Sequence, residues 1–485
     1  MTSQVQTSKF FVDGKWTAGA STETFDLRNP ATGEVIGSVP KATKEDVRGA
    51  IDAARHAFEA PSWRDMEQTK RGKLLVQIAA LIRQNFDELS KLETLNQGKP
   101  IRESKADVAW TIRAFEYWAG VADKIEGETI PVTPNRLTYT IREPLGVTAH
   151  VIPWNYPLSL AARSLAPALA AGNTIVAKPA ALTPLTLLRI AEYGQKAGLP
   201  DGVLNVVTGS GTVAGRELVS NPDIDGITFT GSTETGRQIM EAASRNATPV
   251  LLELGGKNPN IVFPDADFEK AVQMAKYAIF TNAGQMCWAG SRLFLHEEIY
   301  EKFLGELKKQ TELLKIGPGL DEKTELGPLV SKEQQERVLS YIKSGLEDGA
   351  RLLTGGTLPE EVILRNGYFI KPAIFTDVRA DMKIGCEEIF GPVLTVFKFK
   401  TAEEVIQMAN ETQFGLYAGV WTYNLKPAQL LVNRLQAGVV AVNDYMVAYP
   451  QTPFGGYKDS GIGYESGLQA ITHYTRIKSV TVNVS

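Results

Sequence analysis

The spacing of apolar residues along the chain changes near residue 145. The first segment, 9–40, has the short apolar runs and turn signals of small strands. Apolar residues at helical spacing follow it, and Thr43 with Asp46 forms a capping-box pattern at the start of the first such stretch. The pattern predicts a helix that begins there, one long helix over 74–98 and a third helix around 110–118.

From 145 to 255 short apolar runs alternate with helical stretches. We expect strands at 147–152, 174–177, 204–207, 226–229 and 250–254, with helices near 159–171, 184–197, 212–220 and 233–245. This alternation predicts an α/β fold with a parallel sheet, which binds ligands at the carboxyl ends of its strands. The alternation resumes from 268 to about 440. The last run, 479–484, predicts an edge strand that can add to a partner subunit's sheet.

Composition narrows the function classes. The chain has 485 residues, of which 43% are hydrophobic and 22% charged, as in ordinary globular proteins. A net charge of −4 without a basic tract argues against nucleic-acid binding. No apolar run of about 18 residues and no signal-peptide pattern are visible, so we expect no membrane span and a cytoplasmic location. Two cysteines suit a reducing compartment, and four scattered histidines predict no metal site.

Glycine-rich turns follow two of the expected strands. Ser232 comes after Gly231 and opens a helix, whose N-terminus favours a phosphate group. Gly211 and Gly215 lie in a second glycine-rich turn, although its spacing is one residue longer than the dinucleotide fingerprint. Each turn alone is equally consistent with an ordinary strand-to-helix connection.

Three other residues at or near strand ends have side chains that can do chemistry. Cys287 lies in a loop of small residues, Glu253 ends a strand before two glycines, and Asn155 follows another strand. A thiol, a carboxylate and an amide are the groups of a nucleophile, a general base and an oxyanion donor. Taken singly, each has an ordinary alternative: a buried thiol, a surface carboxylate or a helix cap.

Six motifs in a fixed order make the pattern specific. They are Pro153-Trp154-Asn155-Tyr156-Pro157, Phe229-Thr230-Gly231-Ser232-Thr233-Glu234, Leu252-Glu253-Leu254-Gly255-Gly256-Lys257, Gly284-Gln285-Met286-Cys287, Glu387-Glu388-Ile389-Phe390-Gly391-Pro392 and the segment from Pro453 to Gly461. Over nearly its whole length the chain resembles the aldehyde dehydrogenase superfamily. The resemblance implies a Rossmann-like cofactor-binding domain (1–121 and 145–254), an α/β catalytic domain (255–467) and a small β oligomerisation element (122–144 and 468–485). It also implies a homodimer or homotetramer.

The resemblance assigns roles position by position. Cys287 falls at the family's nucleophile, which attacks a small-molecule aldehyde; Asn155 falls at the oxyanion donor and Glu253 at the general base. The reaction passes through a thiohemiacetal and a thioester, with NAD or NADP as cofactor. The positions that match the family's cofactor contacts are Ile152, Trp154, Lys178, Gly211, Gly215, Phe229, Ser232, Leu254, Glu388 and Phe390.

Two positions depart from common members of the family. Ala181 stands where many NAD-preferring members have a glutamate, which predicts that NADP is accepted; alternatively, NAD binds through Lys178 alone. Arg163 stands where several members have a tryptophan, which favours a small polar or anionic aldehyde; alternatively, it is a surface arginine. Thr281 lacks the second arginine of succinate-semialdehyde-specific relatives.

Other readings stay open at this point. The aromatic residues Tyr156, Trp288, Tyr445, Tyr449 and Phe454 suit a tunnel for aromatic or long-chain aldehydes instead. A CoA-acylating relative is a further alternative, although such members usually lack the base that Glu253 would supply. A non-catalytic structural relative is the third, although such proteins typically lose a reacting residue, and here Cys287, Glu253 and Asn155 are all present.

Overall fold

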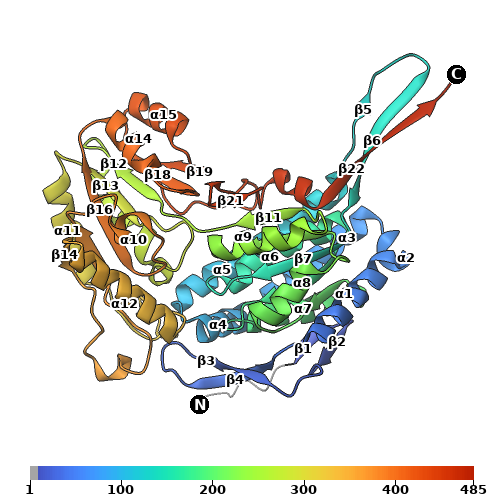
Figure 1. The fold of residues 1–485 in the computed structure, drawn as a ribbon, viewed down its shortest axis with the longest axis horizontal. Coiled ribbons are helices and arrows are strands. Elements are labelled where there is room, and N and C mark those ends of the chain that lie inside the picture. Colours follow the sequence, from blue (N-terminus) through green and yellow to red (C-terminus); the bar gives the residue numbers. More distant parts are fainter. Residues whose placement is uncertain (1–8) are drawn as a thin grey trace.

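Two parallel-stranded sheets form the centres of the two lobes of the molecule (Figure 1). The structure is a computed structural model and describes residues 9–485. Residues 1–8, with which the expected cofactor-binding domain begins, lie outside the described residues. Within the described part, no helix combines the length and the apolar character that crossing a membrane requires.

The first sheet has eight strands in the order β2-β1-β9-β8-β7-β10-β11-β21. Its five central strands are parallel, as their apolar runs predict. The strands are β1 (Phe10–Val12), β2 (Lys15–Thr17), β7 (Val147–Ile152), β8 (Thr174–Pro179), β9 (Leu204–Val206), β10 (Gly226–Thr230), β11 (Val250–Glu253) and β21 (Gly461–Ile462). A separate hairpin, β3 (Thr24–Arg28) and β4 (Val35–Pro40), precedes the first helix.

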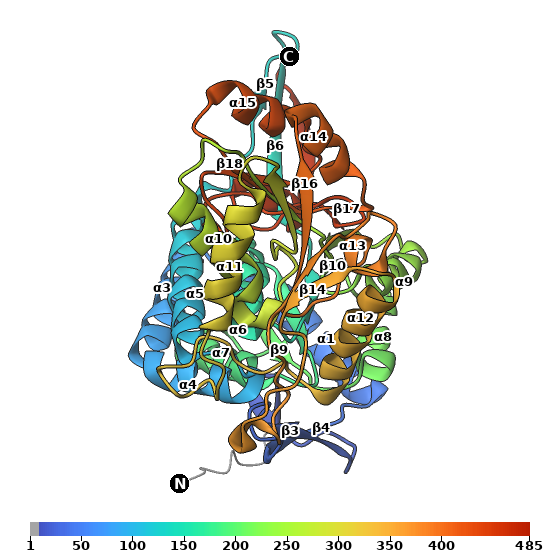
Figure 2. The same ribbon diagram turned by 90° about the vertical axis from the view of Figure 1, so that its left-hand side faces the viewer.

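Helices cover both faces of this sheet (Figures 1 and 2). One group is α1 (Lys44–Glu59), α8 (Arg216–Ser220) and α9 (Thr233–Ser244), with the short α2 (Pro61–Arg64) beside α1. The other group is α6 (Pro157–Ala171) and α7 (Leu185–Lys196), on which α3 (Gln68–Gln84), α4 (Phe86–Gln97) and α5 (Ile101–Val121) pack. A short π-type turn, η2 (Gly211–Gly215), precedes α8, and η1 (Ala122–Lys124) follows α5.

The sequence pattern predicts where a helix begins more accurately than it predicts the length of the helix. The capping box is confirmed: the Asp46 backbone N–H donates to Thr43 Oγ1 (3.2 Å), and the Thr43 N–H donates to Asp46 Oδ2 (2.8 Å). The single helix expected over 74–98 is wrong, because the chain breaks at Asn85 into α3 and α4. Asn85 Nδ2 donates to the Leu81 carbonyl (2.8 Å), and such local side-chain bonds compete with continued helix.

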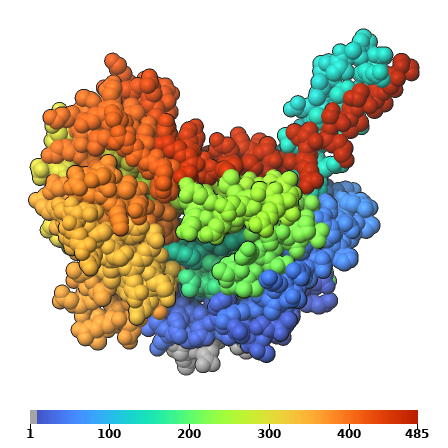
Figure 3. Space-filling view, viewed as in Figure 1, coloured from blue at the N-terminus to red at the C-terminus, as the bar shows by residue number. Residues whose placement is uncertain are grey.

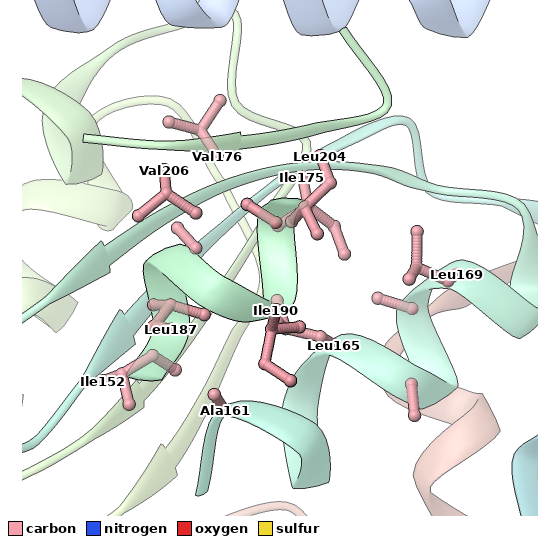
Figure 4. Close-up of a cluster of buried hydrophobic side chains, with 14 of the residues drawn as sticks. Ile152, Ala161, Leu165, Leu169, Ile175, Val176, Leu187, Ile190, Leu204 and Val206 are labelled. Carbon is pink, nitrogen blue, oxygen red and sulfur yellow. The ribbon is translucent and has the colours of Figure 1, made fainter. Parts of the chain in front are cut away.

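Apolar side chains fill the space between the sheet and α6 and α7 (Figure 4). Ile175 on β8 and Val206 on β9 are fully buried, as are Leu165 on α6 and Ile190 on α7. Close packing of this kind leaves little freedom for the strands to move. The loops at the strand ends are therefore carried on a rigid layer.

The second sheet has the order β14-β15-β16-β13-β12-β18-β19, parallel except for β14. Its strands are β12 (Pro259–Val262), β13 (Arg292–His296), β14 (Arg351–Thr354), β15 (Ala373–Thr376), β16 (Val393–Phe399), β18 (Tyr417–Trp421) and β19 (Val439–Val442). The helices of this lobe are α10 (Phe268–Phe280), α11 (Tyr300–Glu312), α12 (Lys332–Glu347), α13 (Lys383–Cys386), α14 (Ala402–Asn410) and α15 (Leu425–Arg434), with 3-10 turns η3 (Thr281–Gly284) and η4 (Val362–Leu364). The 3-10 turn η5 (Leu468–His473) packs on α6 of the first lobe instead, and Ala470 and Ile471 join the core of that lobe. A two-stranded sheet joins β17 (Phe414–Gly415) to β20 (Tyr457–Lys458).

A three-stranded arm projects from the first lobe (Figure 3). It consists of β5 (Thr129–Ile130), β6 (Arg136–Pro144) and β22 (Thr475–Asn483), in the order β22-β6-β5. The edge strand expected at the end of the chain is present, and it begins earlier than the expected residue 479. Pairing with a partner subunit stays a prediction.

The chain crosses back to the first sheet near its end. β21 pairs antiparallel with β11, with Leu252 opposite Ile462 and Glu253 opposite Gly461. β21 lies in the range expected for the catalytic domain, yet its hydrogen bonds complete the other sheet. The two lobes are therefore tied together beside Glu253.

Candidate active site

The residues singled out at strand ends lie along one edge of the first sheet. Parallel pairing sets Ile152 opposite Pro179 and Thr230 opposite Glu253. Asn155, Lys178 and Ser232 therefore lie at or just beyond the carboxyl ends of β7, β8 and β10, on the same side as Glu253. This is the edge at which parallel sheets bind ligands.

A pocket of about 210 Å³ opens beside this edge. Cys287 and Asn155 both line it. The four residues expected to contact substrate line it as well: Tyr156, Arg163, Trp288 and Phe454. Tyr449, expected in an aromatic tunnel, lines the pocket too, whereas Tyr445 is buried and its hydroxyl donates to the Trp288 carbonyl (3.1 Å). The sequence analysis missed other wall residues, which come from α5, α10 and the segment after β19: Trp110, Tyr277 and Met446. The wall is mainly aromatic and apolar.

Two carboxylates of α5, Glu103 and Asp107, also line the pocket. Asp107 Oδ2 accepts from the buried Lys99 Nζ (2.6 Å), and that amine lies 3.8 Å from the centre of the Tyr156 ring. Burial raises the pKa of Glu103 to about 7. The sequence analysis missed these residues because they lie on a helix far from the motifs.

A left-handed turn carries the chain into Cys287. Asn282, Ala283 and Gly284 have φ values of 49°, 51° and 72°. Glu103 Oε2 accepts the Asn282 backbone N–H (2.8 Å). Asn282 Nδ2 in turn donates to the Asn155 carbonyl (3.0 Å), which ties the turn to the end of β7. Three successive residues in this region persist only when their surroundings hold them there.

The turn gives a prediction about Gly284. A Cβ on this residue would overlap the Gly391 carbonyl oxygen, and its φ favours glycine. We expect Gly284→Ala to lower the free energy of unfolding by about 1–3 kcal/mol and to reduce turnover by displacing Cys287. Thermal or urea unfolding with steady-state kinetics measures both effects.

Gly305 in α11 provides a matched control for this substitution. It is exposed, and a Cβ there would meet no other atom of residues 9–485 within 4 Å. Gly305→Ala should therefore stabilise the protein by about 0.5–1 kcal/mol, because glycine weakens helix interiors. Equal stability of the two alanine variants would contradict the strain assigned to Gly284.

The Cys287 thiol is uncharged at neutral pH. Burial raises its pKa to about 12; nearby Arg163 acts to lower the pKa and Glu253 to raise it. A thiol in this environment needs a base before it becomes a nucleophile. Cys386, in contrast, donates to the Met382 carbonyl (3.3 Å) away from the pocket.

Glu253 ends β11 in a dry environment. It is 1% exposed, and burial raises the pKa of its carboxyl well above the usual range, partly opposed by Arg163. Neither of its oxygens has a hydrogen-bond partner within residues 9–485. It lies behind the pocket rather than in its wall, close enough for its charge to act on Cys287.

Arg163 is 7% exposed, so the alternative of a surface arginine is wrong. Its guanidinium forms an ion pair with the buried Glu465 and lies 4.9 Å from the centre of the Phe454 ring. The residue lines the pocket, but a carboxylate of the protein already balances its charge. This weakens the expectation of an anionic substrate.

The predicted cofactor contacts begin with Lys178 at the end of β8. Its Nζ donates to the Pro179 carbonyl (3.0 Å), and burial lowers its pKa to about 8. A Cβ on Gly215 would lie 3.4 Å from Lys178 Cε, in ordinary van der Waals contact, so η2 passes close to the lysine side chain. Ala181 is half-buried just beyond the strand, and Gly211 is exposed at the start of η2.

Ser232 and Glu388 supply two further polar groups. Ser232 is the exposed N-cap of α9, where its Oγ accepts the Thr235 N–H (3.3 Å). Glu388 Oε1 accepts the Gly256 N–H (2.9 Å), and burial raises the pKa of this carboxyl to about 7. An amine, a helix N-terminus and a carboxylate fit the hydroxyls and pyrophosphate of a dinucleotide.

Apolar residues complete this predicted cofactor region. Trp154 packs edge-on against Phe390 with ring centres 5.2 Å apart, and Phe390 has a φ of 62°. Ile152, Phe229 and Leu254 are buried. Phe229 lies under Gly231, and Leu254 lies against Gly236 of α9. These three side chains shape the sheet edge from within.

Comparison with known proteins agrees with this arrangement. The model of the aldehyde dehydrogenase family matches residues 16–480. Betaine aldehyde dehydrogenase of Bacillus subtilis is 46% identical over 475 residues, covering 98% of this chain and 97% of that protein. Hydroxyisobutyraldehyde dehydrogenase of Mycolicibacterium austroafricanum is 44% identical, with 98% and 93% covered.

Solved structures match over the whole chain. The NAD+ complex of an aldehyde dehydrogenase from Bacillus cereus superposes with a TM-score of 0.97 at 45% identity, covering 100% of this chain and 98% of the other. Betaine aldehyde dehydrogenase from Staphylococcus aureus with NAD+ gives 0.98 at 40% identity, with 100% and 96% covered. The expected α/β fold class is confirmed.

Proposed function

Because this chain belongs to the aldehyde dehydrogenase family, we propose that it oxidises a neutral aldehyde to the carboxylic acid through a covalent intermediate on Cys287. NAD or NADP is the cofactor, in keeping with the NAD+ in similar solved structures. The observation that carries the proposal is the shared pocket of Cys287 and Asn155, with Glu253 buried behind it.

The Cys287 thiol and its base, Glu253, carry out the first chemical step. Glu253 takes the thiol proton, and the thiolate attacks the aldehyde carbon to give a thiohemiacetal oxyanion. Asn155 Nδ2 already donates one hydrogen to the Gln285 carbonyl (3.0 Å), which fixes the amide and leaves its second hydrogen for the oxyanion. The backbone N–H of Cys287 is the second donor. Bound NAD(P)+ supplies the hydride acceptor.

Collapse of the oxyanion, with loss of its hydride to the bound acceptor, leaves a thioester on Cys287. Glu253 releases the thiol proton to solvent, and its carboxylate then removes a proton from water, whose oxygen attacks the thioester carbon; the Cys287 thiolate leaves and the acid is released. Its unpartnered oxygens leave it free to serve both steps, as judged over the described residues. A base in this place favours hydrolysis over transfer to CoA.

A direct assay tests the proposal. Purified protein is mixed with a panel of aldehydes and each cofactor, NAD(P)H absorbance is followed, and the product is identified without CoA. We expect cofactor reduction with stoichiometric free acid. Reduction only in the presence of CoA would support the acylating alternative, and no reduction with any aldehyde would support a non-catalytic relative.

The pocket favours neutral aromatic or longer aliphatic aldehydes. Its wall includes Trp110, Tyr156, Trp288 and Phe454, and Glu465 balances the charge of Arg163. This substrate class is the alternative that the aromatic residues suggested in the sequence, and it differs from the small polar or anionic aldehyde that Arg163 suggested. In the same panel we expect kcat/KM to be highest for a neutral aromatic or longer aliphatic aldehyde. A higher value for a carboxylate-bearing aldehyde would contradict this substrate class.

Ala181 gives a prediction about cofactor choice. Alanine does not repel a 2′-phosphate, so we expect the protein to accept NADP. A carboxylate at this position would face the phosphate, and Ala181→Glu should lower kcat/KM for NADP about tenfold or more. NAD should be affected only slightly.

Kinetics with each cofactor check this prediction, with Ala181→Gln as the uncharged control of similar size. The glutamine variant should keep more NADP activity than the glutamate variant. A hundredfold preference of the unaltered protein for NAD would end the hypothesis.

The arm suits a homodimer or homotetramer. β22 is an edge strand, and it exposes Ile477 (62%) and Val482 (41%). An unpaired strand edge with apolar side chains can add to another sheet. Both features support association through this strand.

A further inference from the structure

Arg163 in the pocket wall forms an ion pair with the buried Glu465, and the buried Glu253 lies close enough for both charges to act on its carboxyl group. Arg163 comes from α6, Glu253 from the end of β11 and Glu465 from the segment after β21. All three are buried, with exposures of 7%, 1% and 1%. Burial makes an unbalanced charge costly, so this cluster cannot hold two ionised carboxylates against one cation without penalty.

The hydrogen bonding within the cluster is incomplete. Arg163 Nε lies against Glu465, and Arg163 Nη2 has no hydrogen-bond partner in the part of the chain that the structure describes. Both Glu253 oxygens lack partners as well, within the same residues. Buried donors and acceptors are usually satisfied. Without a hydrogen-bond partner among the described residues, the Glu253 carboxylate depends on the charge of Arg163 for its stabilisation.

The remaining neighbours of Arg163 are known. The Phe454 ring packs against the guanidinium, and Cys287 and Tyr474 lie within reach of its charge. The Tyr474 hydroxyl already forms a hydrogen bond with the Thr228 hydroxyl, with 3.2 Å between the two oxygens. Among these groups, the two that titrate during the proposed reaction are Glu253 and Cys287.

We propose that Arg163 is a positioning residue that acts through Glu253 and Cys287 and does not bind the substrate. The positive charge of Arg163 stabilises the Glu253 carboxylate and the Cys287 thiolate. The negative charge of Glu465 partly offsets this stabilisation. The inference rests on the proposed function. It replaces the sequence-based expectation that Arg163 pairs with an anionic aldehyde.

The two partners of the ion pair should then have opposite effects. Loss of the Arg163 cation makes the Cys287 thiolate and the Glu253 carboxylate less stable. Loss of the Glu465 anion leaves the Arg163 charge for those two groups and makes them more stable. If the ion pair only stabilised the fold, loss of either partner would change the reactivity of Cys287 in the same direction.

The test uses Arg163→Gln, Arg163→Lys and Glu465→Gln in the full-length protein, without aldehyde or cofactor. Iodoacetamide alkylation of Cys287 is followed over pH by mass spectrometry of its peptide, which separates it from Cys386. Near pH 8 we expect Arg163→Gln to slow alkylation about tenfold or more, because one pKa unit changes the thiolate fraction tenfold. Glu465→Gln should accelerate it, and Arg163→Lys should stay near the rate of the unaltered protein.

Steady-state kinetics supply the second readout. The midpoint of the acidic limb of kcat/KM should move to higher pH in Arg163→Gln and to lower pH in Glu465→Gln. The kcat/KM ratio for anionic against neutral aldehydes should not change in Arg163→Gln. Thermal unfolding checks that each variant is folded.

Three results would overturn the inference. They are slower alkylation in both Arg163→Gln and Glu465→Gln, unchanged alkylation in Arg163→Gln, and a selective rise of KM for anionic aldehydes in that variant. If Arg163→Gln does not fold, Glu465→Gln must still accelerate alkylation. Alkylation needs no turnover, so a failure of the unaltered protein to oxidise aldehydes would be recognised separately.

Discussion

Replacing Cys287 with alanine is expected to remove aldehyde oxidation by at least about 10⁴-fold, to the limit of detection. The thiol is the only protein group in the proposed reaction that bonds to the aldehyde carbon. No neighbouring side chain of the pocket wall, as described within residues 9–485, offers a second thiol. NAD(P)H absorbance with the best aldehyde of the panel measures the loss.

Two controls make the result specific. Cofactor binding, followed by quenching of tryptophan fluorescence, should persist in Cys287→Ala, because the predicted cofactor contacts lie along the strand ends. Cys386→Ala should keep nearly full activity, since that thiol bonds to the Met382 carbonyl away from the pocket. Substantial oxidation by Cys287→Ala would overturn the covalent mechanism.

Replacing Glu253 with glutamine is expected to lower kcat by about 10²- to 10⁴-fold, the usual contribution of a general base. Glutamine has nearly the same shape but cannot accept the proton. The reason for so large an effect is the raised pKa of Cys287: burial raises the thiol pKa to about 12, so little thiolate forms without a base.

The same substitution changes the pH dependence. Burial raises the pKa of Glu253, so its proton-accepting form becomes more populated as the pH rises. In the unaltered protein kcat/KM should therefore increase with pH above the range in which an ordinary carboxyl group titrates. Glu253→Gln should lose this limb. The exposed Glu241 on α9 is the matched control, and Glu241→Gln should change neither kcat nor the profile. A profile shared by Glu253→Gln and the unaltered protein would assign the limb to another group.

The sequence was most informative where function depends on strand ends. Asn155, Lys178 and Glu253 are each adjacent to or part of a short apolar run, and parallel pairing alone brings such positions to one edge. Motif resemblance added Cys287 and Glu388. The break at Asn85 was missed because the apolar periodicity runs on through it, whereas the Asn85 backbone leaves helical geometry (φ −109°, ψ 27°) and its side chain bonds to the Leu81 carbonyl.

The substrate pocket was only partly predictable. Trp110 and Glu103 reach it because α5 packs against α6, and no local pattern encodes that contact. The role of Arg163 depends on Glu465, a partner about 300 residues away along the chain. Burial and pairing decide whether an arginine meets substrate or protein, and neither is visible from its neighbours in sequence.

The return of the chain to the first sheet has a consequence for biosynthesis. β11 gains its neighbour β21 only after residue 462 has been made, and Arg163 gains Glu465 just afterwards. During translation the α/β layer of the first lobe emerges from the ribosome well before these partners. Until they emerge, the edge of β11 is unpaired and Arg163 lacks Glu465. Chains that terminate before β21 would expose the unpaired edge of β11, which is prone to aggregation. We therefore expect chaperones to bind such chains and proteases to degrade them.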